Sequence, residues 1–310
     1  MNKVIIVSDP LYIIRNKLLY FRHGLTYFML QSGKNLQCNK NLSRAPASEP
    51  QYGFKPCFEA VLFDLFDTLV LIDDYNISFA QSLLMMHTYL SNNGLDCSFD
   101  DFKSAYLIVE KEISAETACM LEEPHFSVYV ERVLSSLGAK LKAQTHLAMQ
   151  AVNEFSKEFA QHISLDPQAL EVLEFLHQRC KTAVISNLTF SEFAWELLER
   201  FELNKHLDLI IVSGDINLRK PHPQIFSMTL QHLGVQPAKA LFVGDTLETD
   251  IAGARNAGLT SLQIMRRTPV NSIIKPHVRV NELNQLISIF DFPAELASAT
   301  LGEVDLACLT

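Results

Sequence analysis

The chain has 310 residues and a net charge of −9 at neutral pH, with 48% hydrophobic and 20% charged side chains. This composition is that of ordinary globular proteins and excludes whole-chain disorder, collagen and coiled coil. The acidic balance also argues against nucleic acid as a partner. At ~150 residues per domain, the length indicates about two domains, or one domain with a large insertion.

The charge is unevenly distributed along the chain. Residues 1–55 carry eight basic and two acidic side chains, so the remaining residues carry a net charge of −15. We therefore predict a basic, flexible N-terminal extension over residues 1–56, which ends in a proline-rich linker. Import into an organelle through this basic, acid-poor segment is a minor alternative.

The cysteine and hydropathy patterns limit the cellular setting. Six cysteines lie far apart and form no C-x-x-C pair, which indicates reduced thiols, a cytoplasmic location and no zinc site. The most apolar N-terminal stretch is interrupted by Arg22 and His23, well short of the ~18 apolar residues of a membrane span. No membrane association is therefore expected.

Five short apolar runs are typical of strands buried on both faces of a parallel sheet. They lie at 60–63, 182–186, 208–213, 240–244 and 261–265. A helical pattern precedes each of the last four runs, at 170–178, 193–201, 225–234 and 251–258. This alternation predicts the α/β class, with a Rossmann-like, doubly wound parallel sheet as the core.

The interval after the first strand has a different pattern. It contains four helical stretches, at 77–92, 99–118, 125–137 and 145–161, which predict an inserted α-helical bundle. The expected organisation is an α/β core formed by residues 57–74 and 166–292, a helical insertion over 75–165, and a C-terminal tail over 293–310.

Polar residues that end or follow the apolar runs are the candidates for chemistry, because ligands of open α/β sheets bind beyond the carboxyl ends of the strands. These residues are Asp64, Ser186, Lys220 and Asp245. A carboxylate nucleophile, a hydroxyl, a cation and a second carboxylate at one edge suit phosphoryl transfer, which needs charge neutralised and groups held in line.

Four ordered segments carry a resemblance to a known family. They read FDLFDTL at 63–69, VISN at 184–187, KPHPQIF at 220–226 and VGDTLETDIAGARNAGL at 243–259. Together they resemble the haloacid dehalogenase superfamily of hydrolases over roughly residues 58–290. The insertion between the first and second segments is similar to the subgroup with a helical cap at that place.

The resemblance implies a catalytic role for several of these residues. Asp64 would attack phosphorus and form an aspartyl-phosphate. Ser186 and Asn187 would bind the phosphoryl group, and Lys220 would hold its ammonium between the nucleophile and the phosphate. The implied substrate is a small phosphorylated metabolite.

The resemblance also implies a magnesium cofactor. Asp245 would ligate Mg²⁺ together with Asp64 and the backbone carbonyl of Phe66, and Asp250 would support Lys220 and the water shell of the metal. The chemistry is consistent, because neighbouring carboxylates raise one another's pKa unless a cation lies among them. Hard oxygen ligands also suit Mg²⁺.

Position 66 departs from the pattern of the family's phosphatases. Phe66 stands where those enzymes have a second Asp, the general acid that protonates the leaving oxygen. Asp67 lies one residue too late to replace that Asp. Because losing general acid catalysis typically costs ~100- to 10,000-fold in rate, we expect hydrolysis to be slow.

Two other functions therefore stay open. In this respect the chain resembles the family's 2-haloacid dehalogenases, which also have an aromatic residue at this position. Those enzymes need no metal, and their halide leaving group needs no proton. A protein that binds a phosphorylated ligand or a partner protein without turnover is the other alternative. The sequence determines neither the substrate nor the oligomeric state.

Three other features suggest ordinary structural roles. His222 follows Lys220 and is expected to lie at a helix start or on the surface. Trp195 has helical spacing with neighbouring apolar residues, which favours core packing. The pair Arg266 and Arg267 is expected to be solvated.

Overall fold

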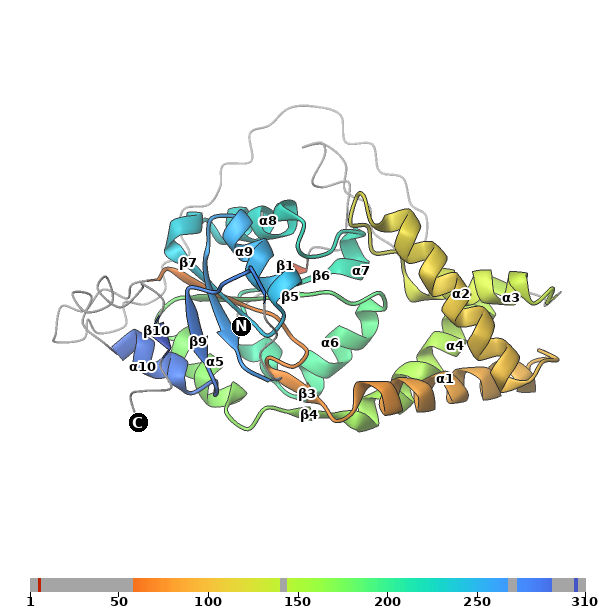
Figure 1. Ribbon diagram of the computed structural model, residues 1–310. Helices are drawn as coiled ribbons and strands as arrows, with labels where there is room; N and C mark the ends of the chain where they lie inside the picture. The colour runs from red at the N-terminus through yellow and green to blue at the C-terminus, as the bar shows by residue number, and fades with distance from the viewer. Residues whose placement is uncertain (1–4, 7–57, 140–143, 267–271, 292–303, 306–310) are drawn as a thin grey trace, which may run out of the picture.

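The computed structural model describes residues 5–6, 58–139, 144–266, 272–291 and 304–305. Figure 1 shows a sheet flanked by helices and, beside it, a bundle of longer helices. The predicted α/β class with an inserted helical bundle is confirmed.

The sheet has the strand order β1-β6-β5-β2-β7-β8-β9-β10, and all neighbouring strands are parallel. Its five predicted strands occur within one residue of the expected bounds. They are β2 (Ala60–Phe63), β5 (Lys181–Ser186), β6 (Leu209–Val212), β7 (Ala240–Gly244) and β8 (Thr260–Ile264).

Three short strands at the two ends of the sheet are not predicted by the apolar runs. They are β1 (Ile5–Ile6), β9 (Val278–Val280) and β10 (Val304–Asp305). β1 pairs with β6, so two residues of the predicted N-terminal extension join the sheet. The rest of that extension lies outside the described residues, as does the predicted C-terminal tail apart from β10.

Both faces of the central strands are buried. Phe63 of β2 and Val243 of β7 belong to one hydrophobic cluster, whereas the preceding residues Leu62 and Phe242 belong to a second cluster on the opposite face. Because successive strand residues point to opposite faces, a strand covered on both sides needs an unbroken apolar run. This requirement explains why the sequence pattern identified these strands.

Helices cover both faces. Side chains of α5 (Ala169–His177), α6 (Ser191–Arg200) and α10 (Gln285–Asp291) enter the first cluster. Side chains of α8 (Pro223–Leu233) and α9 (Ala252–Asn256) enter the second. Short helical segments complete the connections: η2 (Leu203–His206), α7 (Ser213–Ile216), η3 (Pro237–Lys239) and η4 (Leu247–Ile251).

The insertion consists of four helices within two residues of their predicted ends: α1 (Tyr75–Asn92), α2 (Phe99–Thr117), α3 (Phe126–Ser136) and α4 (Gln144–Phe159). The side chains of Asp74 and Ser98 accept backbone N–H bonds from the first turns of α1 and α2, which fixes where these helices begin. In the described ranges, no helix combines the length and the apolar character that crossing a membrane requires.

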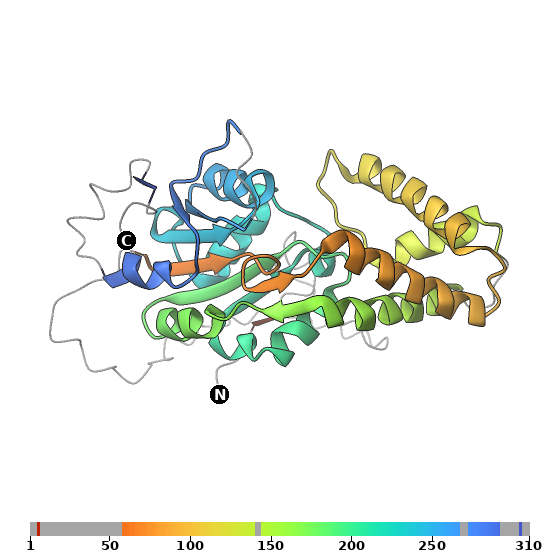
Figure 2. The ribbon, with the colours of Figure 1, turned by 60° about the horizontal axis from the view of Figure 1, so that its bottom comes forward.

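An antiparallel ribbon joins the insertion to the sheet. β3 (Val70–Ile72) leads into α1, and β4 (Ile163–Leu165) returns from α4 through η1 (Ala160–His162). The two strands pair with each other and form a sheet of their own (Figure 2). These three-residue strands are too short to give a clear alternating pattern, so they were not predicted from the sequence.

Aromatic packing makes the insertion continuous with the sheet. The ring of Phe155 in α4 lies 5.1 Å from Phe79 and 5.2 Å from Phe126, centroid to centroid. Phe126 also stacks at 5.2 Å on Phe190, which precedes α6 of the core. The first hydrophobic cluster therefore extends without interruption from one face of the sheet into the bundle.

Candidate active site

The predicted polar residues meet at the carboxyl edge of the sheet. Asp64 directly follows β2, Ser186 ends β5, and Asp245 directly follows β7. β2 lies between β5 and β7 in the sheet, so these positions are adjacent although about 180 residues of chain separate the first from the last. The parallel topology alone accounts for this convergence.

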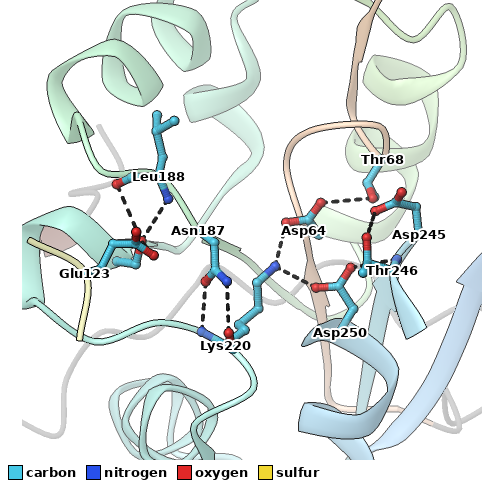
Figure 3. Close-up of polar contacts among 10 residues, drawn as sticks. Asp64, Thr68, Glu123, Asn187, Leu188, Lys220, Asp245, Thr246 and Asp250 are labelled. Atoms are coloured by element: carbon cyan, nitrogen blue, oxygen red, sulfur yellow. Dashed lines mark hydrogen bonds and ion pairs between the residues drawn. The ribbon is translucent and has the colours of Figure 1, made fainter. Parts of the chain in front are cut away.

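Lys220 lies at the centre of the cluster (Figure 3). Its side chain is 2% exposed, and its Nζ lies 2.5 Å from Oδ1 of Asp64 and 2.7 Å from Oδ1 of Asp250. The side-chain amide of Asn187 holds the Lys220 backbone: its Nδ2 donates to the Lys220 carbonyl at 3.0 Å, and its Oδ1 accepts from the Lys220 N–H at 2.8 Å. Asn187 therefore holds the backbone of Lys220 in position. Its contact with a phosphoryl group stays a prediction.

Asp250 is brought into the site by the π-helical segment η4. It is 1% exposed, and its Oδ2 accepts a hydrogen bond from the Thr246 N–H at 3.1 Å. The backbone of Gly244 passes so close that a Cβ there would lie 2.5 Å from Oδ2 of Asp250. Glycine at position 244 is therefore a steric requirement of this arrangement.

Asp245 and Thr68 complete the polar contacts around Asp64. Thr68 Oγ1 donates to Oδ2 of Asp64 at 3.3 Å, and Thr246 Oγ1 donates to Oδ1 of Asp245 at 3.0 Å. Thr68 was not among the residues predicted from the sequence, although it lies within the segment FDLFDTL. Its position four residues after Asp64 was the only feature of the sequence that could have indicated this contact.

Burial and neighbouring charges determine the protonation of this cluster. The pKa of Asp64 is raised to about 7: burial raises it most, the Lys220 ammonium opposes that rise, and the charges of Asp250 and Asp245 add to it. Burial alone would lower the pKa of Lys220, but the carboxylates of Asp250 and Asp64 outweigh that effect and raise it. Lys220 is therefore a permanent cation in the site.

The donor atoms of the cluster suit a hard divalent cation. Asp64, Asp245 and Asp250 each offer an oxygen within 4.8 Å of the others. With all three ionised, they exceed the single Lys220 ammonium by two negative charges. Mg²⁺ prefers carboxylate oxygens and would balance that excess, so the residues present fit the metal that the sequence suggested.

Ser186 has an unsatisfied hydroxyl. It is fully buried at the end of β5, and its Oγ has no hydrogen-bond partner among the described residues. Buried hydroxyls are normally paired, so the Ser186 hydroxyl is available to donate a hydrogen bond to a group that enters the site. A phosphoryl oxygen would supply the acceptor.

Phe66 and Asp67 do not place an acid in the cluster. Phe66 is half-buried and packs against the first hydrophobic cluster, and its backbone forms a bridge with Val70. Asp67 has a left-handed backbone, with φ of 52°, and its Oδ1 accepts from the N–H of Ile72 at 3.3 Å. This contact is consistent with the expectation that Asp67 does not replace the missing acid.

The other candidates have structural contacts. His222 caps α8 through a bond from the Gln224 N–H to its Nδ1, and Trp195 packs against the core while donating to Asp215. The expectation of a solvated Arg266 is wrong, because its side chain is 19% exposed and pairs with Asp166. Arg267 lies outside the described residues.

Comparison with known proteins reveals relatives with hydrolase activity. A sequence profile of haloacid dehalogenase-like hydrolases matches residues 58–258. The chain is 29% identical over 204 residues to ribulose-1,5-bisphosphate 5-phosphatase of Halopiger xanaduensis, covering 66% of this chain and 83% of that protein. It is 33% identical over 141 residues to rat N-acylneuraminate-9-phosphatase, covering 44% of this chain and 54% of that protein.

Solved structures share the fold. A 2-haloacid dehalogenase from Pseudomonas syringae aligns with a TM-score of 0.61 at 21% identity, covering 75% of this chain and 97% of that chain. A phosphatase from Thermococcus onnurineus aligns with a TM-score of 0.52 at 21% identity, covering 75% and 98%. Since the profile spans about two thirds of the sequence and ends on the segment that carries Asp245 and Asp250, the chain belongs to the haloacid dehalogenase-like hydrolases.

Proposed function

We propose that this chain is a magnesium-dependent phosphatase that hydrolyses a small phosphorylated metabolite through an aspartyl-phosphate on Asp64. The buried contact of Lys220 with Asp64 and Asp250, next to Asp245, is the observation that carries this proposal. The relatives support the substrate class, because their names describe phosphatases of a sugar bisphosphate and of a neuraminate phosphate, and a pyrimidine nucleotidase from Escherichia coli that is 27% identical over 204 residues.

Asp64 would act as the nucleophile. One of its carboxylate oxygens forms a bond to phosphorus while the bond from phosphorus to the leaving oxygen breaks, and water later releases phosphate and restores the carboxylate. Lys220 holds Asp64 by a 2.5 Å contact and offsets anionic charge as the phosphate approaches. Ser186 donates its otherwise unpaired hydroxyl to a phosphoryl oxygen.

Asp64, Asp245 and the backbone carbonyl of Phe66 would hold Mg²⁺, with Asp250 in support. The ion would supply positive charge against the phosphate and the carboxylates. Asp250 also contacts Lys220, so its carboxylate would connect the Lys220 ammonium with the metal site. Asn187 keeps the Lys220 backbone in place.

Phe66 limits the rate of this reaction. A phenyl ring donates no proton to the leaving oxygen, so substrates with a good leaving group are favoured.

We propose that helices α1–α4 act as a cap that closes over the site and excludes water. Cys97, Cys119 and Cys180 are free thiols, which supports a cytoplasmic location as part of the same proposal.

A phosphate-release screen across a panel of metabolites, run with magnesium and with a chelator, tests the proposal. We expect release from at least one small phosphate ester in magnesium, loss of release in chelator, and no release by Asp64→Asn, which keeps the shape of the side chain and removes the nucleophile. Asp74→Asn is the matched control, because Asp74 caps α1 outside the site.

Three results would contradict the proposal. Full activity of Asp64→Asn would show that the nucleophile is wrongly assigned. Release of chloride from 2-chloropropionate that survives chelator would favour displacement of halide, and silence across the whole panel would favour a binding protein on the same fold.

A further inference from the structure

Arg266 connects parts of the chain that are far apart in sequence. It lies two residues beyond β8, and its Nη2 donates to Oδ2 of Asp166 at 2.5 Å. The same guanidinium donates from Nη2 to the carbonyl of Thr68 at 3.1 Å and from Nε to the carbonyl of Asp67 at 3.3 Å. Arg266 is thus bound to protein acceptors on the turn that follows Asp64.

Asp166 links this contact to the helical insertion. It directly follows β4, the strand that returns from the bundle, and it is 3% exposed. Its backbone N–H donates to the carbonyl of Leu69 at 3.0 Å, and its Oδ1 accepts from the Gln168 N–H at 2.8 Å. The position of the Asp166 carboxylate is therefore fixed by contacts that do not involve Arg266.

The turn held by Arg266 determines the surroundings of Asp64. Asp67 has a φ of 52°, a left-handed conformation that is uncommon for residues other than glycine. The next residue, Thr68, donates its hydroxyl to Oδ2 of Asp64 at 3.3 Å. The peptide between Phe66 and Asp67 carries the carbonyl that we assign to the metal, so the conformation of Asp67 sets the direction of that carbonyl.

We propose that Arg266 is a positioning residue for the reaction: through Asp166 and the carbonyls of Asp67 and Thr68, it fixes the turn that orients Asp64 and ties it to the strand returning from the insertion. This inference rests on the proposed phosphatase function. A guanidinium suits the task, because its planar fork reaches several acceptors at once, which a lysine ammonium on a flexible stem does not.

The test compares Arg266→Lys and Arg266→Met with the full-length wild type. In magnesium, we expect kcat on the best substrate of the panel to fall by about 10- to 100-fold, because a small misplacement of reacting groups costs that much. KM should change by less than about threefold, because no contact with substrate is removed. Free guanidinium at millimolar concentration should restore part of the activity of Arg266→Met.

The matched control is Arg132→Lys. Arg132 also binds a carboxylate through two N–H bonds, to Glu116 at 2.7 and 2.8 Å, but on the exposed surface of the bundle. Its kcat and KM should equal those of the wild type. Asp166→Asn keeps an acceptor for Arg266 without the charge, so its kcat should fall in the same direction by a smaller factor.

Magnesium affinity, measured by calorimetry without substrate, gives a second readout. We expect it to weaken by about tenfold or more in Arg266→Lys, because residues that orient ligands affect affinity to that extent. A folded Arg266→Lys with wild-type kcat and wild-type magnesium affinity would overturn the inference.

The same measurements separate this inference from the proposed function. A wild type that neither hydrolyses any ester of the panel nor binds magnesium overturns both. A wild type that binds magnesium without hydrolysis overturns the phosphatase proposal, and the change in affinity of Arg266→Lys then decides the role of Arg266.

Discussion

Under the proposed function, the side chain at position 66 decides whether the site holds a general acid. Phe66 lies in the turn between Asp64 and Thr68, where it packs against the first hydrophobic cluster and offers no proton. The buried cluster of Asp64, Lys220 and Asp250 is otherwise assembled. The identity of this residue should therefore set the rate and leave the rest of the site intact.

Phe66→Asp is expected to raise hydrolysis of an aryl phosphate by at least about tenfold, since a positioned general acid typically contributes 100-fold or more. Steady-state rates in saturating magnesium measure the effect. Phe66→Asn is the control, because it has nearly the same shape as Asp and carries no dissociable proton. Equal rates for both variants would show that no proton is needed at this position.

At Gly244, a single added methyl group would reach a side chain of the candidate site. Gly244→Ala should displace Asp250, because the new Cβ would lie 2.5 Å from its Oδ2. We expect kcat to fall by about 100-fold, the usual result of misplacing groups around a reacting centre. Gly138→Ala is the control: its φ of 69° also disfavours alanine, but nothing lies within 4 Å of a Cβ there, so stability and not kcat should change.

Among the elements, the loop between α2 and α3 ties the insertion to the core. Glu123 on this loop is 6% exposed; its Oε2 accepts from Ser213 Oγ at 3.4 Å, and its Oε1 lies 3.9 Å from Arg219. Ser213 Oγ accepts in turn from the N–H of Leu188, next to Asn187. The loop therefore touches the segments that position Lys220.

Burial raises the pKa of Glu123 to about 6, against the opposing effects of Arg219 and Ser213. The unfolded chain releases this proton near pH 4.5, before the folded chain does, so the free energy of unfolding should fall by about 2 kcal/mol between pH 4.5 and 7. Glu123→Gln cannot titrate and should lack this contribution. Urea unfolding of both proteins at the two pH values measures it; a stability difference that is independent of pH would contradict the assignment.

For the whole molecule, metal binding and folding should be coupled. The carboxylates of Asp64, Asp245 and Asp250 come from chain segments that meet only in the folded state, so the unfolded chain offers no comparable site. Magnesium at 100 times its Kd should stabilise the protein by about 2.7 kcal/mol. Thermal unfolding in magnesium and in EDTA measures this effect as a rise in Tm.

The matched variants for this measurement are Asp245→Asn and Glu116→Gln. Asp245→Asn removes one ligand and should lose most of the rise in Tm. Glu116→Gln removes an exposed carboxylate of α2 and should keep it. An equal Tm in magnesium and EDTA for the wild type would show that these carboxylates do not bind the ion.

The sequence by itself determined the strands and helices with long, clear patterns. The runs at 60–63 and 240–244 were identified because both faces of those strands are buried, and α1–α4 because their apolar residues recur at helical spacing. Asp64, Lys220 and Asp245 could be selected because parallel strands end at one edge of a sheet. These features depend on local sequence.

Tertiary structure alone decided the partners of side chains that act across the chain. From its charge, Arg266 was expected to be solvated. Instead, the strand that returns from the insertion places Asp166 beside it, 100 residues away in sequence. The ribbon of β3 and β4 and the contact of Glu123 with Ser213 arise in the same way. Such contacts depend on how distant segments pack, and no periodicity within one segment encodes them.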